Sequence, residues 1–125
     1  MDHVSASVSF LKIEEIEFPL FLVNFSDGVR MDYSKVEKTR KAYAELSKNV
    51  KLRLIVDLIG VKQVDEDSRK ALTDRDMEDR IEVIAILVRD LISRMIENVL
   101  VGLNKASVPL KLFSDFDSAK NWIKE

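Results

Sequence analysis

The sequence contains no cysteine, and it has one histidine, three glycines and two prolines among its 125 residues. The lack of cysteine excludes disulfides, thiolate catalysis and cysteine-ligated metal sites. A lone His3 near the N-terminus argues against a catalytic triad or a histidine-rich metal site. Gly28, Gly60 and Gly102 are too scattered to form a phosphate-binding glycine loop. We therefore expect no enzymatic activity, no cofactor and no metal.

The charge has no strong excess of either sign, with 20 Lys and Arg against 22 Asp and Glu. The net charge of −2 favours neither nucleic-acid nor membrane-surface binding. No apolar run is long enough for a transmembrane helix. The N-terminus lacks the basic and apolar regions of a signal peptide. We expect one cytoplasmic domain that covers residues 1–125.

The chain is organised around a short apolar strand that leads into an acidic turn. The strand, Leu52–Leu58, is nearly continuous in apolar residues, which predicts a strand covered on both faces inside a parallel sheet. Asp65, Glu66, Asp67 and Ser68 then precede a predicted helix. These side chains are typical helix caps, and capping alone explains them. The alternative is a binding site, because sites in open α/β sheets lie at the carboxyl ends of strands.

The remaining segments alternate between strand and helix patterns. Residues Val4–Ile13 alternate as a half-exposed edge strand, and Val83–Val88 is a second interior strand. The other predicted elements are an acidic turn at Glu14, Glu15 and Glu17, strands at Phe18–Phe25, Val29–Met31 and Val108–Phe113, and helices at Ser34–Val50, Arg69–Arg80 (one or two short helices), Leu91–Leu103 and from about Asp115 with Ser114 as its cap. The order predicts an α/β fold with a mixed, mostly parallel sheet of four to five strands and about four helices.

Two of the predicted helices have notable surfaces. The first has the capping-box pattern of Ser34 and Glu37, and its core stripe is Val36, Thr39, Tyr43, Leu46 and Val50. Its other faces are basic, which favours a solvated exterior over contact with an acidic partner. The helix at residues 91–103 is more apolar than one core face requires; its stripe is Leu91, Ile92, Met95, Ile96, Val99, Leu100 and Leu103. This surplus indicates a lipid or other apolar ligand, a homodimer interface, or burial on two sides.

The central stretch resembles the STAS domain of bacterial anti-sigma-factor antagonists. In that family an apolar strand ends in Asp, and an Asp-Ser-Ser-Gly turn opens a helix a few residues later. Here Ile55-Val56-Asp57-Leu58 and Val64-Asp65-Glu66-Asp67-Ser68 occupy the matching places. Asp67 stands where the phosphorylated hydroxyl would be, so the resemblance implies a constitutive site with Ser68 as the fallback acceptor.

The C-terminal third resembles a branch of small bacterial STAS-like proteins that are often grouped with the lipid-binding CRAL-TRIO fold. The matching positions are Ala85 to Arg89, Ser93, Arg94, Asn98, Gly102 to Lys105, Val108, Pro109, Leu112, Phe113, Ala119, Trp122 and Ile123. The resemblance implies a non-enzymatic regulatory module. We expect it to bind a protein partner through Asp57 and the turn at residues 65–68, and the alternative is carriage of an apolar ligand by the helix at residues 91–103.

Overall fold

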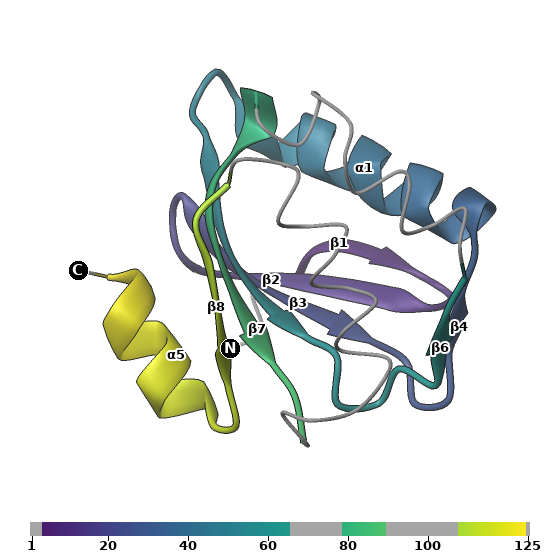
Figure 1. Cartoon of the computed structure of the whole chain (residues 1–125). Helices are drawn as coiled ribbons and strands as arrows, with labels where there is room; N and C mark the ends of the chain where they lie inside the picture. The colour runs from purple at the N-terminus through teal and green to yellow at the C-terminus, as the bar shows by residue number, and fades with distance from the viewer. Residues whose placement is uncertain (1–3, 66–78, 90–107, 125) are drawn as a thin grey trace.

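The computed structural model describes residues 4–65, 79–89 and 108–124. Its main sheet has six strands in the order β1-β2-β3-β5-β7-β8. The first two pairings, β1–β2 and β2–β3, are antiparallel, whereas β3–β5, β5–β7 and β7–β8 are parallel. Figure 1 shows α1 and α5 on opposite sides of this sheet. The elements are β1 Val4–Val8, β2 Leu11–Glu17, β3 Leu20–Phe25, β4 Arg30–Met31, α1 Tyr33–Ser47, β5 Leu52–Asp57, β6 Gln63–Val64, β7 Ile81–Leu87, β8 Leu110–Phe113 and α5 Phe116–Ile123.

The predicted α/β fold and its mixed, mostly parallel sheet are confirmed. Strand β5 lies inside the sheet, and its residues serve two apolar clusters, as the two-sided apolar run predicts. Leu54 belongs to the cluster on the α1 side and Ile55 to the cluster on the α5 side; both are at most 1% exposed. Strand β7 repeats this arrangement through Ile84 and Ala85. The sheet therefore has a core on each face.

The predicted strand at Val4–Ile13 is wrong in its connectivity, because the chain reverses near Phe10. The segment forms a hairpin in which β1 pairs with β2, and the three glutamates placed in a turn lie on or at the end of β2. The reversal is held inside the core: Phe10 is 7% exposed and its ring stacks on Phe25 at a centroid distance of 6.5 Å. The hairpin supplies the sixth strand of the sheet.

The N-terminal caps of both described helices differ from the predicted residues. Asp32, rather than Ser34, caps α1, and its carboxylate accepts a hydrogen bond of 2.9 Å from the Lys35 backbone N–H. Asp115, rather than Ser114, caps α5 and accepts from the Ser118 N–H at 2.8 Å. In both residues, this backbone hydrogen bond is the main reason why the pKa of the carboxylate is lowered.

The predicted core stripe of α1 holds except at its end. Val36, Thr39 and Tyr43 are buried and Leu46 packs against the core. Val50 lies beyond the helix and is 44% exposed. Burial raises the pKa of Tyr43.

The final helix packs against the sheet through Ala119 and Ile123, with Trp122 against the Phe113 ring at 5.6 Å. Two helices, α1 and α5, lie within the described residues, where about four were predicted. Of the remaining two predictions, the helix at Leu91–Leu103 and most of the helix at Arg69–Arg80 lie outside those residues; Asp79 and Arg80 are helical. Within the described ranges, no helix is long and apolar enough to cross a membrane.

Candidate functional site

A two-stranded parallel ribbon joins the loops that follow β3 and β5. In this ribbon Arg30 of β4 lies opposite Gln63 of β6, and Met31 lies opposite Val64. The Arg30 guanidinium also donates a 2.7 Å hydrogen bond to the side-chain oxygen of Gln63. Figure 1 shows the two strands side by side below the first turn of α1. We call β4, β6 and the flanking residues 26–33 and 57–65 the ribbon edge.

Backbone hydrogen bonds hold the ribbon edge along its whole length. The Gly28 N–H donates to the Gly60 carbonyl at 2.7 Å, and the Lys62 N–H donates to the Val29 carbonyl at 2.8 Å. At the far end the Asp65 N–H donates to the Met31 carbonyl at 3.2 Å. The chain is thus positioned up to the first residue of the predicted acidic turn.

Two glycines allow the loops to approach each other. Gly28 has a φ of +76°, a conformation that favours glycine. At Gly60 a Cβ atom would lie 3.2 Å from the Cα of Asp27 and would meet the Asp27 carboxylate. The close approach of the Asp27 loop therefore favours glycine at position 60.

Asp57 and Asp65, the two predicted site residues inside the described ranges, both lie at the ribbon edge. Asp57 ends β5, and its carboxylate accepts a 2.9 Å hydrogen bond from the Ile59 N–H. This bond shapes the turn after the strand. Asp65 follows β6 directly and is half-buried. The other predicted residues of the turn, Glu66, Asp67 and Ser68, lie outside the described ranges.

Sequence reasoning missed two acidic residues that the fold brings to this edge. Asp27 packs on Gly60. Asp32 follows β4 as Asp65 follows β6, and because the two strands are parallel, Asp32 and Asp65 lie at the same end of the ribbon. Asp32 also forms an ion pair with Lys35, with an Nζ–Oδ2 distance of 3.3 Å. The signals were present: Asp27 belongs to an Asp-Gly turn pair, and Asp immediately before a helix is a preferred cap.

Apolar side chains at the ribbon edge divide into anchors and exposed groups. Leu58 and Val61 are 7% and 6% exposed, and they attach the β5–β6 loop to the core. Ile59, between them, is 37% exposed, and Tyr33 at the start of α1 is 52% exposed. An exposed aromatic ring and an exposed aliphatic side chain beside carboxylates are suited to binding another surface. Within the described ranges, no group of three or more residues is arranged to hold a metal ion.

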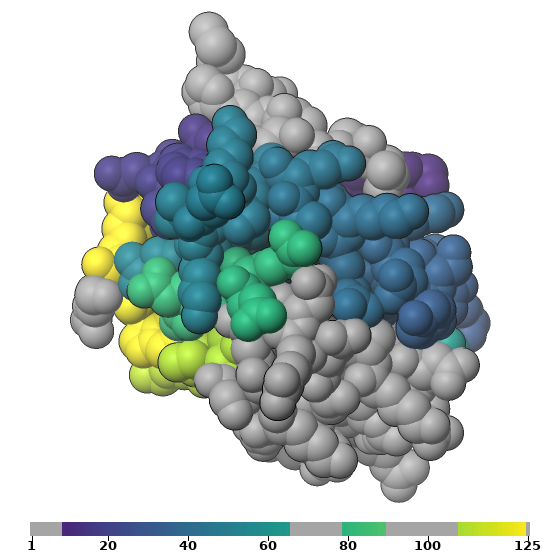
Figure 2. Space-filling view, turned by 90° about the horizontal axis from the view of Figure 1, so that it is seen from above, coloured from purple at the N-terminus to yellow at the C-terminus, as the bar shows by residue number. Residues whose placement is uncertain are grey.

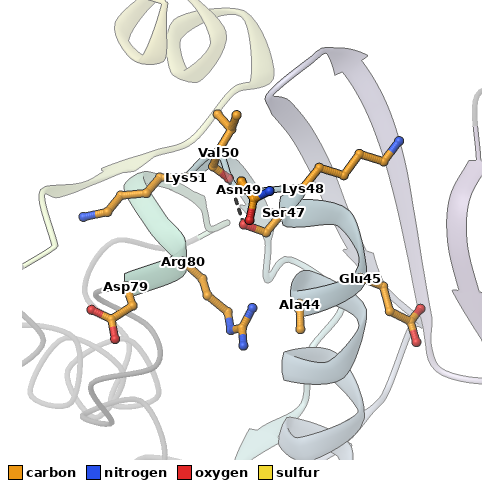
Figure 3. Close-up of a pocket in the computed structure, with 9 residues that line it drawn as sticks. All are labelled: Ala44, Glu45, Ser47, Lys48, Asn49, Val50, Lys51, Asp79 and Arg80. Atoms are coloured by element: carbon orange, nitrogen blue, oxygen red, sulfur yellow. Dashed lines mark hydrogen bonds between the residues drawn. The ribbon is translucent and has the colours of Figure 1, made fainter.

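A polar pocket of about 620 Å³ lies at the opposite end of the parallel strands, where α1 ends and β5 and β7 begin. Figure 3 shows the Arg80 side chain extending toward α1, whereas the side chains of Lys48 and Lys51 point away from the pocket. In the space-filling view, the start of β7 (green) lies by the end of α1 and the following loop (blue to teal) (Figure 2). The loop has φ values of +42° at Lys48 and +68° at Asn49. The negative end of the α1 dipole favours a cation such as Arg80 here.

The predicted apolar ligand or dimer surface, Leu91–Leu103, lies outside the described residues. The likeness to CRAL-TRIO proteins, lipid binding and homodimer formation through this segment stay predictions. The described residues do not test these predictions.

Comparison with known structures finds the same fold in two other proteins. An anti-sigma factor antagonist from Mycobacterium paratuberculosis is 17% identical with a TM-score of 0.62, and the match covers 92% of this chain and 93% of that chain. An uncharacterized protein from the DUF3478 family with a SpoIIAA-like fold, from Shewanella loihica PV-4, is 13% identical with a TM-score of 0.61; the match covers 94% and 98%. No curated protein matches the sequence.

The structural likeness confirms the STAS-like fold that the resemblance around Asp57 and Asp65 implies. At these identities the likeness concerns the fold. The sequence itself matches a family over residues 15–125, which is most of the chain. The protein therefore has a STAS-like fold and belongs to the family described as Domain of unknown function (DUF7793).

Proposed function

We propose that the protein is a non-enzymatic regulatory module that binds a protein partner through its ribbon edge and the adjoining turn at residues 65–68. The observation that carries the proposal is the hydrogen bond from the Asp65 N–H to the Met31 carbonyl. It holds the start of the turn beside the first turn of α1. A fold shared with an anti-sigma factor antagonist supports the same regulatory role.

The side chains of the ribbon edge support binding to a partner that carries basic groups. Asp27, Asp57 and Asp65 lie along the two loops, and Glu66 and Asp67 follow in the sequence. Tyr33 and Ile59 add exposed apolar area at the same edge. A few buried anchors, most often aromatic residues and arginine, supply most of the binding energy at protein interfaces, whereas complementary charges steer the encounter and set specificity.

The acidic turn supports a constitutive form of this module. Asp67 has no hydroxyl group, and its single charge reproduces only part of a phosphate, which carries roughly −1.5 to −2 and three acceptor oxygens. We expect no phosphate at position 67 after incubation with a serine kinase of the anti-sigma type. Phosphate on Ser68 in cells would restore a phosphorylation switch and contradict the constitutive proposal.

Site-specific crosslinking in the native cells tests the docking surface. A photoreactive amino acid replaces Lys62 at the ribbon edge, and in a matched variant it replaces Lys41 on the outer face of α1; both positions are exposed. We expect one discrete crosslinked protein from position 62 and none from position 41. A discrete product from position 41 alone would place the partner on the basic helix face and contradict the proposal.

The second predicted function, carriage of a lipid or other apolar molecule, rests on residues 91–103. No observation within the described residues favours it over docking at the ribbon edge. It stays a prediction, which substitutions at Ile96 and Val99 test.

A further inference from the structure

The polar pocket at the end of α1 has a wall that two reciprocal hydrogen bonds fix. The Ser47 hydroxyl donates to the Val50 carbonyl at 2.8 Å, and the Val50 N–H donates to the Ser47 carbonyl at 2.7 Å. Between these two residues, Lys48 and Asn49 both have a positive φ, which turns the chain from the helix toward β5. Figure 3 shows this closed loop at the end of α1. The chain itself therefore preorganises one side of the pocket.

The charged side chains around the pocket differ in direction. Figure 3 shows the Arg80 side chain extending toward α1, whereas the carboxylates of Glu45 and Asp79 point away from the pocket. The ammonium groups of Lys48 and Lys51 also point outward. Among the charged residues that line the pocket, Arg80 is thus the one whose side chain enters the space. Its guanidinium has five N–H donors in a planar fork that matches a carboxylate, so it can bind a carboxylate in addition to a protein group.

The opposite side of the pocket is negative in character, because α1 ends there. The last four carbonyl groups of a helix have no partner within the helix, and the aligned peptide dipoles give this end a partial negative charge. Ala44, Glu45 and Ser47 of this last turn line the pocket. Carbonyl acceptors at a negative helix end suit an ammonium group, which has three N–H donors. They disfavour a ligand that is only anionic.

We propose that this pocket binds a free α-amino acid, with the carboxylate on the Arg80 guanidinium and the ammonium group at the carbonyl end of α1. A free amino acid carries both charges on one carbon atom, whereas a protein chain terminus offers one of the two. A requirement for both charges therefore selects the free molecule. The volume of about 620 Å³ lies within the roughly 300–1,000 Å³ of small-molecule sites and leaves room for a side chain. The pocket and the ribbon edge lie at opposite ends of the parallel strands, so this site is separate from the proposed docking surface.

NMR titrations of the isotope-labelled full chain test the ligand class. L-Alanine carries both charged groups, propionate carries only the carboxylate, and ethylamine carries only the ammonium group. With L-alanine we expect saturable shifts of the backbone amides of Ser47–Lys51 and Arg80, with a Kd of about 1 mM. Propionate and ethylamine should each bind at least about tenfold more weakly, because each leaves one side of the pocket without its partner. If L-alanine gives no saturable shift of these amides up to about 20 mM, or if propionate binds as tightly as L-alanine, the proposal is overturned.

Two matched variants test the role of Arg80. Arg80→Gln and Lys51→Gln each remove one positive charge from the lining of the pocket, but only the Arg80 side chain extends into it. We expect Arg80→Gln to weaken L-alanine binding at least about tenfold and Lys51→Gln to weaken it less than about twofold. The amide spectra show whether each variant is folded. Equal affinities of the two folded variants overturn the proposal, and if Arg80→Gln does not fold, the comparison of L-alanine, propionate and ethylamine on the natural chain decides.

Discussion

Replacing Gly60 by alanine tests the packing that holds the ribbon edge together. The added Cβ atom would lie 3.2 Å from the Asp27 Cα and would meet the Asp27 carboxylate, so the two loops must separate or the Asp27 side chain must turn away. The Gly60 carbonyl accepts the 2.7 Å hydrogen bond from Gly28, so movement of this loop also strains that bond. Overpacking of this kind costs about 1–3 kcal/mol of folding free energy.

Urea unfolding measures the cost, and a second variant separates its causes. In an Asp27→Ala background the carboxylate is gone while the backbone of residue 27 stays close to the new methyl group, so the penalty of Gly60→Ala should fall below about 1 kcal/mol. Gly28→Ala is the matched control for backbone conformation: nothing lies within 4 Å of its Cβ position, and its cost comes from the φ of +76°. If Gly60→Ala costs the same with and without the Asp27 side chain, the carboxylate is not the cause and the reasoning fails.

Three further predictions concern the core, the α1 cap and the undescribed apolar segment. Ile55→Ala should lower the free energy of unfolding by about 2–5 kcal/mol in urea titrations, since Ile55 is fully buried; a cost below about 1 kcal/mol would contradict its place in the core. Asp32→Asn should remove a pH-dependent contribution to stability. Because the folded-state pKa of Asp32 is lowered, its stabilisation is complete above the ordinary value of 3.8 and is lost as the pH falls through the lowered value; an unchanged pH profile in the variant would refute this. Ile96→Glu or Val99→Glu, followed by sedimentation and lipid extraction, separates the roles of residues 91–103: a dimer reduced to a folded monomer indicates an interface there, and lipid lost at unchanged mass indicates a pocket. A lipid-free wild-type monomer in which the whole apolar stripe of residues 91–103 is buried internally would leave the segment as core alone.

The interior strands could be predicted because each is marked by a pattern within its own few residues. Strands β5 and β7 are continuous apolar runs of strand length, and both faces of each are buried as such runs require. The hairpin near Phe10 carried no such signal. The turn there has no glycine or proline, and its one mark in the sequence is that the period-two alternation changes phase between the adjacent apolar residues Phe10 and Leu11.

The ribbon edge could be predicted only in part, because long-range contacts build it. Asp57 ends a strand and Asp65 follows one, and both were identified. Strands β4 and β6, however, have two residues each and are distant in the sequence. Their pairing also decides the cap of α1. With Met31 held in β4, the chain is extended at Asp32, and the helix begins one residue later, ahead of the Ser34 capping pattern.

The central claim is that the ribbon edge is the docking surface. The most direct test is the affinity of the crosslinked partner for charge-reversed variants. Asp65→Lys reverses a charge at the end of β6, and Asp117→Lys makes the same change on the exposed face of α5. With circular dichroism confirming that both variants fold, titration calorimetry against the purified partner should show binding weakened at least about tenfold by Asp65→Lys and less than about twofold by Asp117→Lys. Equal affinities for the two variants, or a larger loss from Asp117→Lys, would contradict docking at the ribbon edge.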